Sequence, residues 1–463
     1  MKQTLLVTAL AIITLPALAN SENDIKSGGA TTVFDQGRNA FSLPAHNLGI
    51  LRRDNFFIGN AFFTQPWVSS PASTKARDGL GPLFNTNSCQ SCHVKDGRGK
   101  PPMGKNEDFL SALIRLSIPA TTDAQREMVR KDGAVADPNY GGQIQNRAIQ
   151  GIKPEAQPRL TYQEIKGSFK DGEAYTLIKP TLSFKDLAYG DLHPELMTSV
   201  RVTPAMIGLG LLDAISDEDI IKNSDPDDTD KDGISGRVNK VWDISKQDTV
   251  IGRFGWKANQ PTISQQVMGA FNGDMGLTSE LFQNQNCTSV QSDCAKAPHG
   301  GIPEVPKNIM DTVVFYSSTL AVPARRNTKT EAAIKGKQLF TSAGCSSCHT
   351  TSFKTGDHSS IPELSQQTIH PYTDLLLHDM GEGLADGRPD FLATGSEWRT
   401  PPLWGIGLVE TVNAHTRFLH DGRARNLSEA ILWHGGEGEQ SKQRYTEMSK
   451  ADRDALITFL ETL

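Results

Sequence analysis

The chain carries the stretch Cys89-Gln90-Ser91-Cys92-His93 and repeats its pattern as Cys345-Ser346-Ser347-Cys348-His349. Two thiols one helical turn apart can add to the two vinyl groups of one porphyrin, and the adjacent imidazole then reaches the iron. A lone Cys-x-x-Cys could instead form a disulfide or half of a zinc site. Because both copies end in histidine, we predict two haem c groups, with His93 and His349 as iron ligands.

A shorter repeat precedes the two motifs. Leu83-Phe84 and Leu339-Phe340 both place the phenylalanine five residues before the first cysteine. This suggests one cytochrome c unit used twice, in which a helix before the motif packs against a later helix. Apolar residues at helical spacing predict the later helices, namely Ile309, Val313, Tyr316 and Leu320 and, after the cap candidate Ser449, Leu456, Phe459, Leu460 and Leu463.

We therefore expect a mainly α protein of two cytochrome c-like domains, each with one covalently bound haem. Residues 20–325 would form the first domain and residues 326–463 the second. The first is too long for a minimal unit, so it should contain a large loop-rich insertion, rich in Gly and Pro, between the first motif and Ile309. Strand content should be low, with Glu173 to Ile178 in a small hairpin.

The first residues predict export. Lys2 precedes an apolar run from Leu5 to Leu15, and Ala17-Leu18-Ala19 has the form of a secretory cleavage site. A run of about 11 apolar residues is shorter than the roughly 20 that a spanning helix needs. We expect residues 1–19 to be a signal peptide, the mature protein to be periplasmic, and no segment to span a membrane.

The overall charge argues against one class of partner. The chain has 47 Lys and Arg residues and 53 Asp and Glu residues, a formal net charge of −6. Nucleic-acid binding depends on a strongly basic surface, so we do not expect it here.

The remaining cysteines, Cys287 and Cys294, lie in a polar segment without a neighbouring histidine. In an oxidising compartment they should form a disulfide. Two free thiols or a redox-active pair is the alternative.

An acidic segment suggests a second metal. Asp228, Asp230 and Asp232 alternate before Gly233, so three carboxylates could converge on one calcium ion. The twelfth position holds Asn239 instead of the glutamate of an EF-hand. A solvated acidic loop is the alternative.

Longer segments carry a family resemblance. They are Asp78-Gly-Leu-Gly-Pro-Leu-Phe-Asn85, Asp96-Gly-Arg-Gly-Lys-Pro-Pro102, Arg201-Val-Thr-Pro-Ala-Met-Ile-Gly-Leu-Gly-Leu-Leu212, Asp232-Gly-Ile-Ser-Gly-Arg237 and Glu397-Trp-Arg-Thr-Pro-Pro-Leu-Trp404. In these the chain resembles the di-haem oxidoreductases described as peroxidases or thiol oxidoreductases. That family is distantly related to the bacterial di-haem cytochrome c peroxidases and to the di-haem enzyme that matures a tryptophan-derived quinone.

The resemblance implies ligands for the second haem. In the wider superfamily a Tyr/Phe-x-His-Asp-Gly segment, here beginning at Phe418, precedes a helix whose end carries the distal ligand. That position is His434, which implies an iron held by His349 and His434. An exposed histidine at a helix end is the alternative. The resemblance also places His378 and Arg399 near this haem, where each could contact a propionate or simply be exposed.

For the first haem the resemblance implies a reactive side. The segment Gln266-Val-Met-Gly-Ala-Phe-Asn-Gly-Asp274-Met275 is similar to the helix that faces peroxide in relatives, but it is two residues shorter and has Asp where they have Glu. Asp274 is the expected acid/base group and Gln266 the orienting group. The helix could instead only pack, or Met275 or Met206 could ligate the iron.

Three functions remain open from the sequence. The first is an enzyme of peroxidase type, in which one haem activates peroxide or a similar small oxidant and the other relays electrons from a small cytochrome or cupredoxin. The second is a non-catalytic electron-transfer protein that serves a periplasmic partner. The third is a redox role in iron handling or in side-chain modification. Tryptophans that could bridge the haems, or only pack in the core, are Trp67, Trp256, Trp398 and Trp404.

Overall fold

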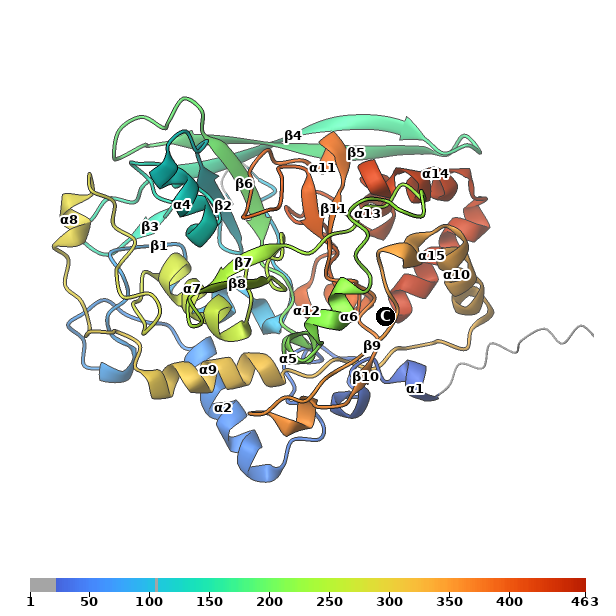
Figure 1. Ribbon diagram of the computed structural model, residues 1–463, viewed down its shortest axis with the longest axis horizontal. Helices are drawn as coiled ribbons and strands as arrows, with labels where there is room; N and C mark the ends of the chain where they lie inside the picture. The colour runs from blue at the N-terminus through green and yellow to red at the C-terminus, as the bar shows by residue number, and fades with distance from the viewer. Residues whose placement is uncertain (1–21, 105–106) are drawn as a thin grey trace, which may run out of the picture.

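The computed structural model describes residues 22–104 and 107–463 (Figure 1). The expected signal peptide lies outside the described residues. The structure is 32% helix and 17% strand and contains many small sheets. The expectation of a mainly α fold with two cytochrome c-like domains is therefore wrong. The region between the motifs, which we expected to be mostly loops, holds seven of the strands named below, because segments such as Ala112–Ser117 bury alternate side chains and pair.

The helices vary from a single turn to about four turns. They are α1 (Glu22–Ile25), α2 (Ile50–Thr64), α3 (Cys89–Cys92), α4 (Asp123–Asp132), α5 (Leu209–Asp213), α6 (Asp217–Ile221), α7 (Ile263–Met275), α8 (Ser292–Ala295), α9 (Lys307–Thr319), α10 (Glu331–Ser342), α11 (Gly381–Leu384), α12 (Val409–Asn413), α13 (Leu427–Leu432), α14 (Glu439–Glu447) and α15 (Lys450–Thr462).

The strands form antiparallel pairs in the described part of the chain. The pairs are β1 (Leu83–Phe84) with β3 (Arg147–Ala148), β2 (Ala112–Ser117) with β6 (Met197–Val202), β4 (Gln157–Ser168) with β5 (Ala174–Lys185), β7 (Lys240–Asp243) with β8 (Asp248–Ile251), β9 (Phe353–Lys354) with β10 (Thr368–Ile369), and β11 (Leu377–Asp379) with β12 (Glu397–Arg399).

The longest pair, β4 and β5, is a hairpin of twelve residue pairs, much longer than the one expected around Glu173. Figure 1 shows it running along the top of the molecule and reaching the C-terminal helices. Near its tip, Arg453 of α15 pairs with Asp171 at 2.9 Å and with Glu173 at 2.6 Å. The hairpin therefore links the region between the motifs to the end of the chain.

Two helix crossings support the two motifs. Helix α2 packs against α9, and α10 packs against α15. A Cβ at Gly59 would collide with the carbonyl oxygen of Thr312, and a Cβ at Gly336 would collide with that of Ala455. Only glycine permits such a close backbone approach. The helices predicted from the apolar spacing around Ile309 and after Ser449 are confirmed as α9 and α15.

The crossings show which positions correspond. Leu339-Phe340 lies in α10, but Leu83-Phe84 lies in strand β1, so the Leu-Phe repeat does not mark equivalent sites. Phe63 lies four residues after Gly59 in α2, and Phe340 lies four residues after Gly336 in α10. The structural repeat is therefore Gly-x3-Phe, at unequal distances before the two motifs.

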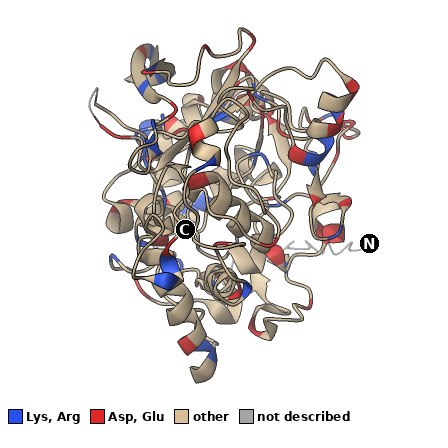
Figure 2. Ribbon diagram, turned by 90° about the vertical axis from the view of Figure 1, so that its left-hand side faces the viewer, with Lys and Arg blue, Asp and Glu red and all other residues tan. Residues whose placement is uncertain are grey.

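Two large hydrophobic clusters form the core. One contains Phe56 and Trp404, and the other contains Leu116 and Phe459, so both draw on the chain before and after residue 325. The domain boundary at that residue stays a prediction. Basic and acidic residues are mixed along the ribbon (Figure 2). Among the described residues, no helix is both long enough and apolar enough to cross a membrane.

Candidate functional site

Both Cys-x-x-Cys-His stretches wrap into one helical turn. The backbone N–H of His93 donates to the carbonyl of Cys89 at 2.9 Å, and that of His349 donates to the carbonyl of Cys345 at 3.0 Å. None of the four motif thiols forms a disulfide. Each motif thus presents two thiols on one turn with its histidine directly after, as attachment of one porphyrin requires.

The two motif histidines have the same ring environment. Nδ1 of His93 donates to the carbonyl of Pro204 at 2.9 Å, and Nδ1 of His349 donates to the carbonyl of Tyr372 at 2.9 Å. Burial lowers the pKa of both rings to about 4, so both are neutral near pH 7. A neutral ring with its proton on Nδ1 has a lone pair on Nε2, the form that ligates iron.

His434 lines the same cavity as the second motif and has this same form. It follows α13, and its Nδ1 donates to the carbonyl of Ala430 at 2.8 Å. Burial lowers its pKa. Burial is also the main reason for the low pKa of His349, and His434 lowers this pKa further. The second motif therefore has two neutral imidazoles on one cavity.

One cavity of about 810 Å³ connects the sites, and both motifs line it. This volume is near the upper end of the range for ligand sites, roughly 300–1,000 Å³. The cavity wall is rich in arginine, namely Arg98, Arg115, Arg201, Arg253, Arg388 and Arg399.

A buried charge cluster on this wall fits an anionic ligand. Arg201 and Arg388 both pair with Asp390, at 2.9 and 3.1 Å, so two cations share one carboxylate. One terminal nitrogen of Arg201 is buried without a partner in the described structure. Guanidinium groups match carboxylate geometry. Haem carries two propionates, so the thiols, histidines and arginines together fit two haems.

The wall beside the first motif is polar. Asp274, near the end of α7, accepts a hydrogen bond at Oδ1 from Nε2 of Gln143 at 2.9 Å. Burial raises the pKa of Asp274, whereas this bond and the charge of Arg115 oppose the rise. Burial also raises the pKa of the Cys92 thiol to about 12, and the charge of Asp274 raises it further, so Asp274 lies near the motif.

Gln266 lines the cavity but does not hold Asp274. Eight residues along a helix correspond to about 12 Å, too far for direct contact. Gln143, which the sequence did not single out, makes that contact. Met206 and Met275 also line the cavity, so both remain within reach of a ligand there.

His378 lies beside the second motif, with Nδ1 at 3.6 Å from Sγ of Cys348. Its Nε2 contacts Asp374 at 2.8 Å and its Nδ1 contacts Glu437 at 2.6 Å. Burial alone would lower its pKa, but these hydrogen bonds hold the pKa well above its ordinary value. A propionate contact would have to replace one of these carboxylates. Arg399 donates to the carbonyl of Gly255 and also lines the cavity.

The four tryptophans lie in different places. Trp256, Trp398 and Trp404 line the cavity, whereas Trp67 packs against the ring of Phe271 in the core. Trp398 stacks on the His420 ring with centroids 3.6 Å apart. Their bridging role stays a prediction.

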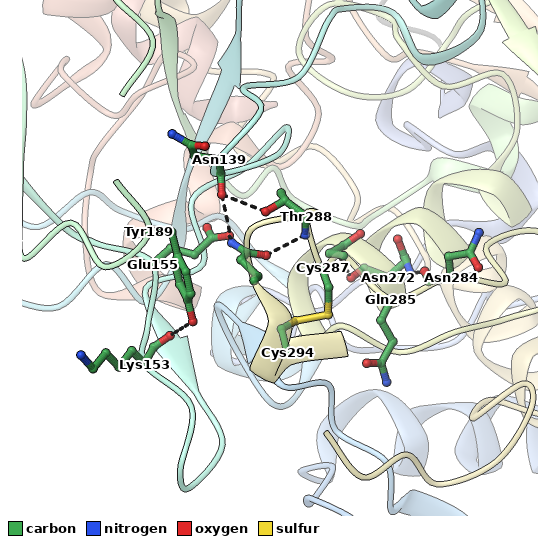
Figure 3. Close-up of a disulfide and its surroundings, with 12 residues drawn as sticks. Asn139, Lys153, Glu155, Tyr189, Asn272, Asn284, Gln285, Cys287, Thr288 and Cys294 are labelled. Carbon is green, nitrogen blue, oxygen red and sulfur yellow. Dashed lines mark hydrogen bonds between the residues drawn. A yellow bond between two sulfur atoms is a disulfide. The ribbon is translucent and has the colours of Figure 1, made fainter. Parts of the chain in front are cut away.

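Cys287 and Cys294 form a disulfide with an S–S distance of 2.00 Å, which confirms that expectation (Figure 3). Thr288 in the same loop donates to the carbonyl of Asn139 at 3.0 Å. Asn272 of α7 donates to the carbonyl of Asn284, three residues before Cys287, at 2.9 Å. The segment that leads into the disulfide is thus bonded to the helix that carries Asp274.

The acidic loop holds its three carboxylates close together. One ligand atom from each of Asp228, Asp230 and Asp232 lies within 4.8 Å of the others. Each carboxylate also accepts a backbone N–H within the loop, at 2.8 to 3.2 Å. The three oxygens could hold a cation, but such acidic groups also occur without one. Calcium stays a prediction.

Comparison with known proteins gives one match. The family model described as "Di-haem oxidoreductase, putative peroxidase" matches residues 22–463. The chain belongs to this di-haem oxidoreductase family. No curated protein and no solved structure matches it. The family implies haem as the cofactor of this di-haem oxidoreductase, in agreement with the fit of the two motifs.

Sequence reasoning missed several residues of the first site. Arg115 and Gln143 face each other across an antiparallel bridge, and both line the cavity. Their only signal is alternation, since a charged or amide side chain stands where one face of a short strand should be apolar. Asp96 and Tyr316 also went unnoticed as a pair, because 220 residues separate them.

Proposed function

We propose that this di-haem oxidoreductase is an exported, periplasmic enzyme of peroxidase type whose two haems have separate duties. The first haem reacts with peroxide or a similar small oxidant, and the second relays electrons. The observation that carries the proposal is the difference between the two sites. A second neutral imidazole, His434, lines the cavity near the second motif, whereas Asp274, Gln143 and Arg115 gather near the first.

Haem bound at the motifs would supply one-electron redox chemistry and an iron on which an oxidant can bind. Cys89, Cys92 and His93 would hold the first group. Cys345, Cys348 and the imidazoles of His349 and His434 would hold the second. Histidine in place of methionine lowers a haem's reduction potential, because thioether ligation raises it.

Asp274 is the proposed acid/base group. Gln143 donates to its Oδ1, which leaves Oδ2 to take a proton from a bound hydroperoxide and return it to the departing oxygen. Burial raises the pKa of Asp274 toward the pH at which a carboxyl both accepts and donates protons. The positive charge of Arg115 favours the ionised form that accepts the proton. Gln266 does not contact Asp274, so its proposed role is to contact the oxidant.

The electron donor is proposed to be a small periplasmic protein such as a cytochrome or a cupredoxin. The second candidate function is electron transfer without catalysis, for example in periplasmic iron handling. Met206 and Met275 favour it, because both line the cavity and either sulfur could give the first iron a sixth ligand.

Absorption and electron paramagnetic resonance (EPR) spectra of the oxidised and half-reduced holoprotein, with and without hydrogen peroxide or cyanide, separate the two. The enzyme should have one iron that binds cyanide and reacts with peroxide beside one low-spin iron that does neither. Two unreactive low-spin irons would contradict the enzyme and support the electron carrier.

A further inference from the structure

Tyr316 lies beside the first motif, inside the crossing of α2 and α9. Its side chain is fully buried, with 0% exposure. The Phe63 ring stands between it and the iron ligand, with centroids 5.1 Å from Tyr316 and 6.2 Å from His93. Two ring contacts therefore connect the phenol to the predicted ligand of the first haem.

The hydroxyl of Tyr316 is held in one direction. It donates to Oδ1 of Asp96 at 2.6 Å and accepts from Nδ2 of Asn60 at 2.8 Å. An amide NH₂ can only donate and an ionised carboxylate can only accept, so the phenolic hydrogen must point at Asp96. Asp96 is 1% exposed, which places this bond away from water.

The second helix crossing provides an internal comparison. The carbonyl that meets the crossing glycine belongs to Thr312 in α9 and to Ala455 in α15. Four residues later, α9 has Tyr316, whereas α15 has Phe459. Phe459 lies 5.3 Å from Phe340, which lies 6.1 Å from His349, the same arrangement as at the first site. An aromatic ring is enough for this packing. The hydroxyl and its carboxylate are additions at the first site.

Tyr372 also packs on Phe340, with ring centroids 6.0 Å apart. In the described structure its hydroxyl has no hydrogen bond to a carboxylate. A buried tyrosine therefore occurs beside each motif, but only Tyr316 has a proton acceptor in place.

We propose that Tyr316 is a redox-active tyrosine that gives one electron to the first haem site when a hydroperoxide oxidises it, an inference that rests on the proposed function. Reduction of one hydroperoxide takes two electrons and two protons from solvent, breaks the O–O bond and releases an alcohol or water together with water. When both irons start oxidised, Tyr316 supplies one of the two electrons, and haem held by His93 would supply the other.

The phenolic O–H bond of Tyr316 breaks in this step. Its electron passes to the oxidised centre through the contacts with Phe63 and His93, and its proton moves to Oδ1 of Asp96. A neutral phenoxyl radical remains. An electron from the donor protein and the proton on Asp96 later restore the phenol. The tyrosine thus keeps the second oxidising equivalent inside the protein until the donor arrives.

The test uses the fully oxidised holoprotein, one equivalent of hydrogen peroxide and rapid freezing, with EPR and optical spectra on each sample. Wild type should give a tyrosyl EPR signal that narrows when the protein contains ring-deuterated tyrosine. Tyr316→Phe should lose that signal but keep the optical change of the haem. This variant gives the first crossing the phenylalanine that the second crossing has at the equivalent position, Phe459. Asp96→Asn should also lose it, because the amide cannot take the proton.

Tyr372→Phe is the matched control and should keep the signal. Haem content and circular dichroism show whether Asp96→Asn is folded. No optical response to peroxide in wild type would reject the proposed function and this inference with it. An optical response without a tyrosyl signal, a signal that survives in Tyr316→Phe, or one that disappears in Tyr372→Phe would overturn the inference alone.

Discussion

At the scale of single residues, Asp274 combines function with a cost in stability. Because burial raises its pKa, the folded state binds its proton more tightly than the unfolded state does. The contribution of Asp274 to the free energy of unfolding is therefore most favourable at a pH below its pKa in the unfolded state. This contribution declines as pH rises through its pKa in the folded state. Asp274→Asn should be more stable than wild type near pH 7 and no more stable near pH 3, as measured by urea unfolding.

The same change should slow the reaction with peroxide by about 10²–10⁴-fold, the usual worth of a positioned acid/base group. Wild type should lose rate as pH falls through the raised pKa of Asp274, and the variant should lack this limb. Stopped-flow absorbance measures both. The control is Asp132→Asn, an exposed carboxylate that also lines the cavity. A wild-type rate in Asp274→Asn would remove it from the mechanism.

His434 is the second prediction at this scale. His434→Ala should convert the low-spin spectrum of the second haem to high-spin, because in the described structure its imidazole is neutral, half-buried and bonded only through Nδ1. His434→Met should raise the reduction potential of that haem. His299→Ala, at an exposed position, should change neither. Absorption spectra and potentiometric titration provide the measurement, and an unchanged spectrum in His434→Ala would disprove ligation.

At the scale of elements, the helix crossings should tolerate no side chain at their glycines. Gly59→Ala places a Cβ against the backbone of Thr312, and overpacking of this kind costs about 1–3 kcal/mol. Asn55→Ala, on the exposed face of the same helix, should not destabilise, since alanine is the better helix former. Thermal unfolding compares the two variants. Equal melting temperatures would show that α2 and α9 can separate without cost.

Elements also show what could be predicted from sequence. Helices α9 and α15 were predictable because apolar spacing acts locally, and the cap residue Ser449 also marks the start of α15. The motifs were predictable because their chemistry needs five adjacent residues. Strands β2 and β6 were not, since paired residues are 90 positions apart at the Ala112–Val202 end and 80 apart at the other, and the pairing depends on long-range contacts.

The first site was only partly predictable for the same reason. A helix similar to that of relatives indicated Asp274, but Gln143 reaches it from a segment 131 residues earlier in the chain. The partner of a buried carboxylate is set by the fold and leaves no local pattern. The Leu-Phe repeat failed because equal spacing does not require equal secondary structure.

At the scale of the whole molecule, a bound calcium ion should stabilise the folded chain. A cation that binds only the folded state adds about 2.7 kcal/mol at a concentration of 100 times its Kd. Calcium added to chelator-treated protein should therefore raise the melting temperature, and Asp230→Asn should abolish the rise. Asp248→Asn, at an exposed position outside the loop, serves as the control. If neither chelator nor calcium changed the melting temperature, the segment would be a solvated acidic loop without bound calcium.

The β4–β5 hairpin makes the far end of the molecule sensitive to ionic strength. Its tip is held by Arg453, which is 4% exposed, through carboxylates that are 38% and 46% exposed. Mobile ions screen such half-exposed charges far more than buried ones. As salt concentration increases, the tip of the β4–β5 hairpin should detach from α15 first, while the residues around the cavity keep their arrangement.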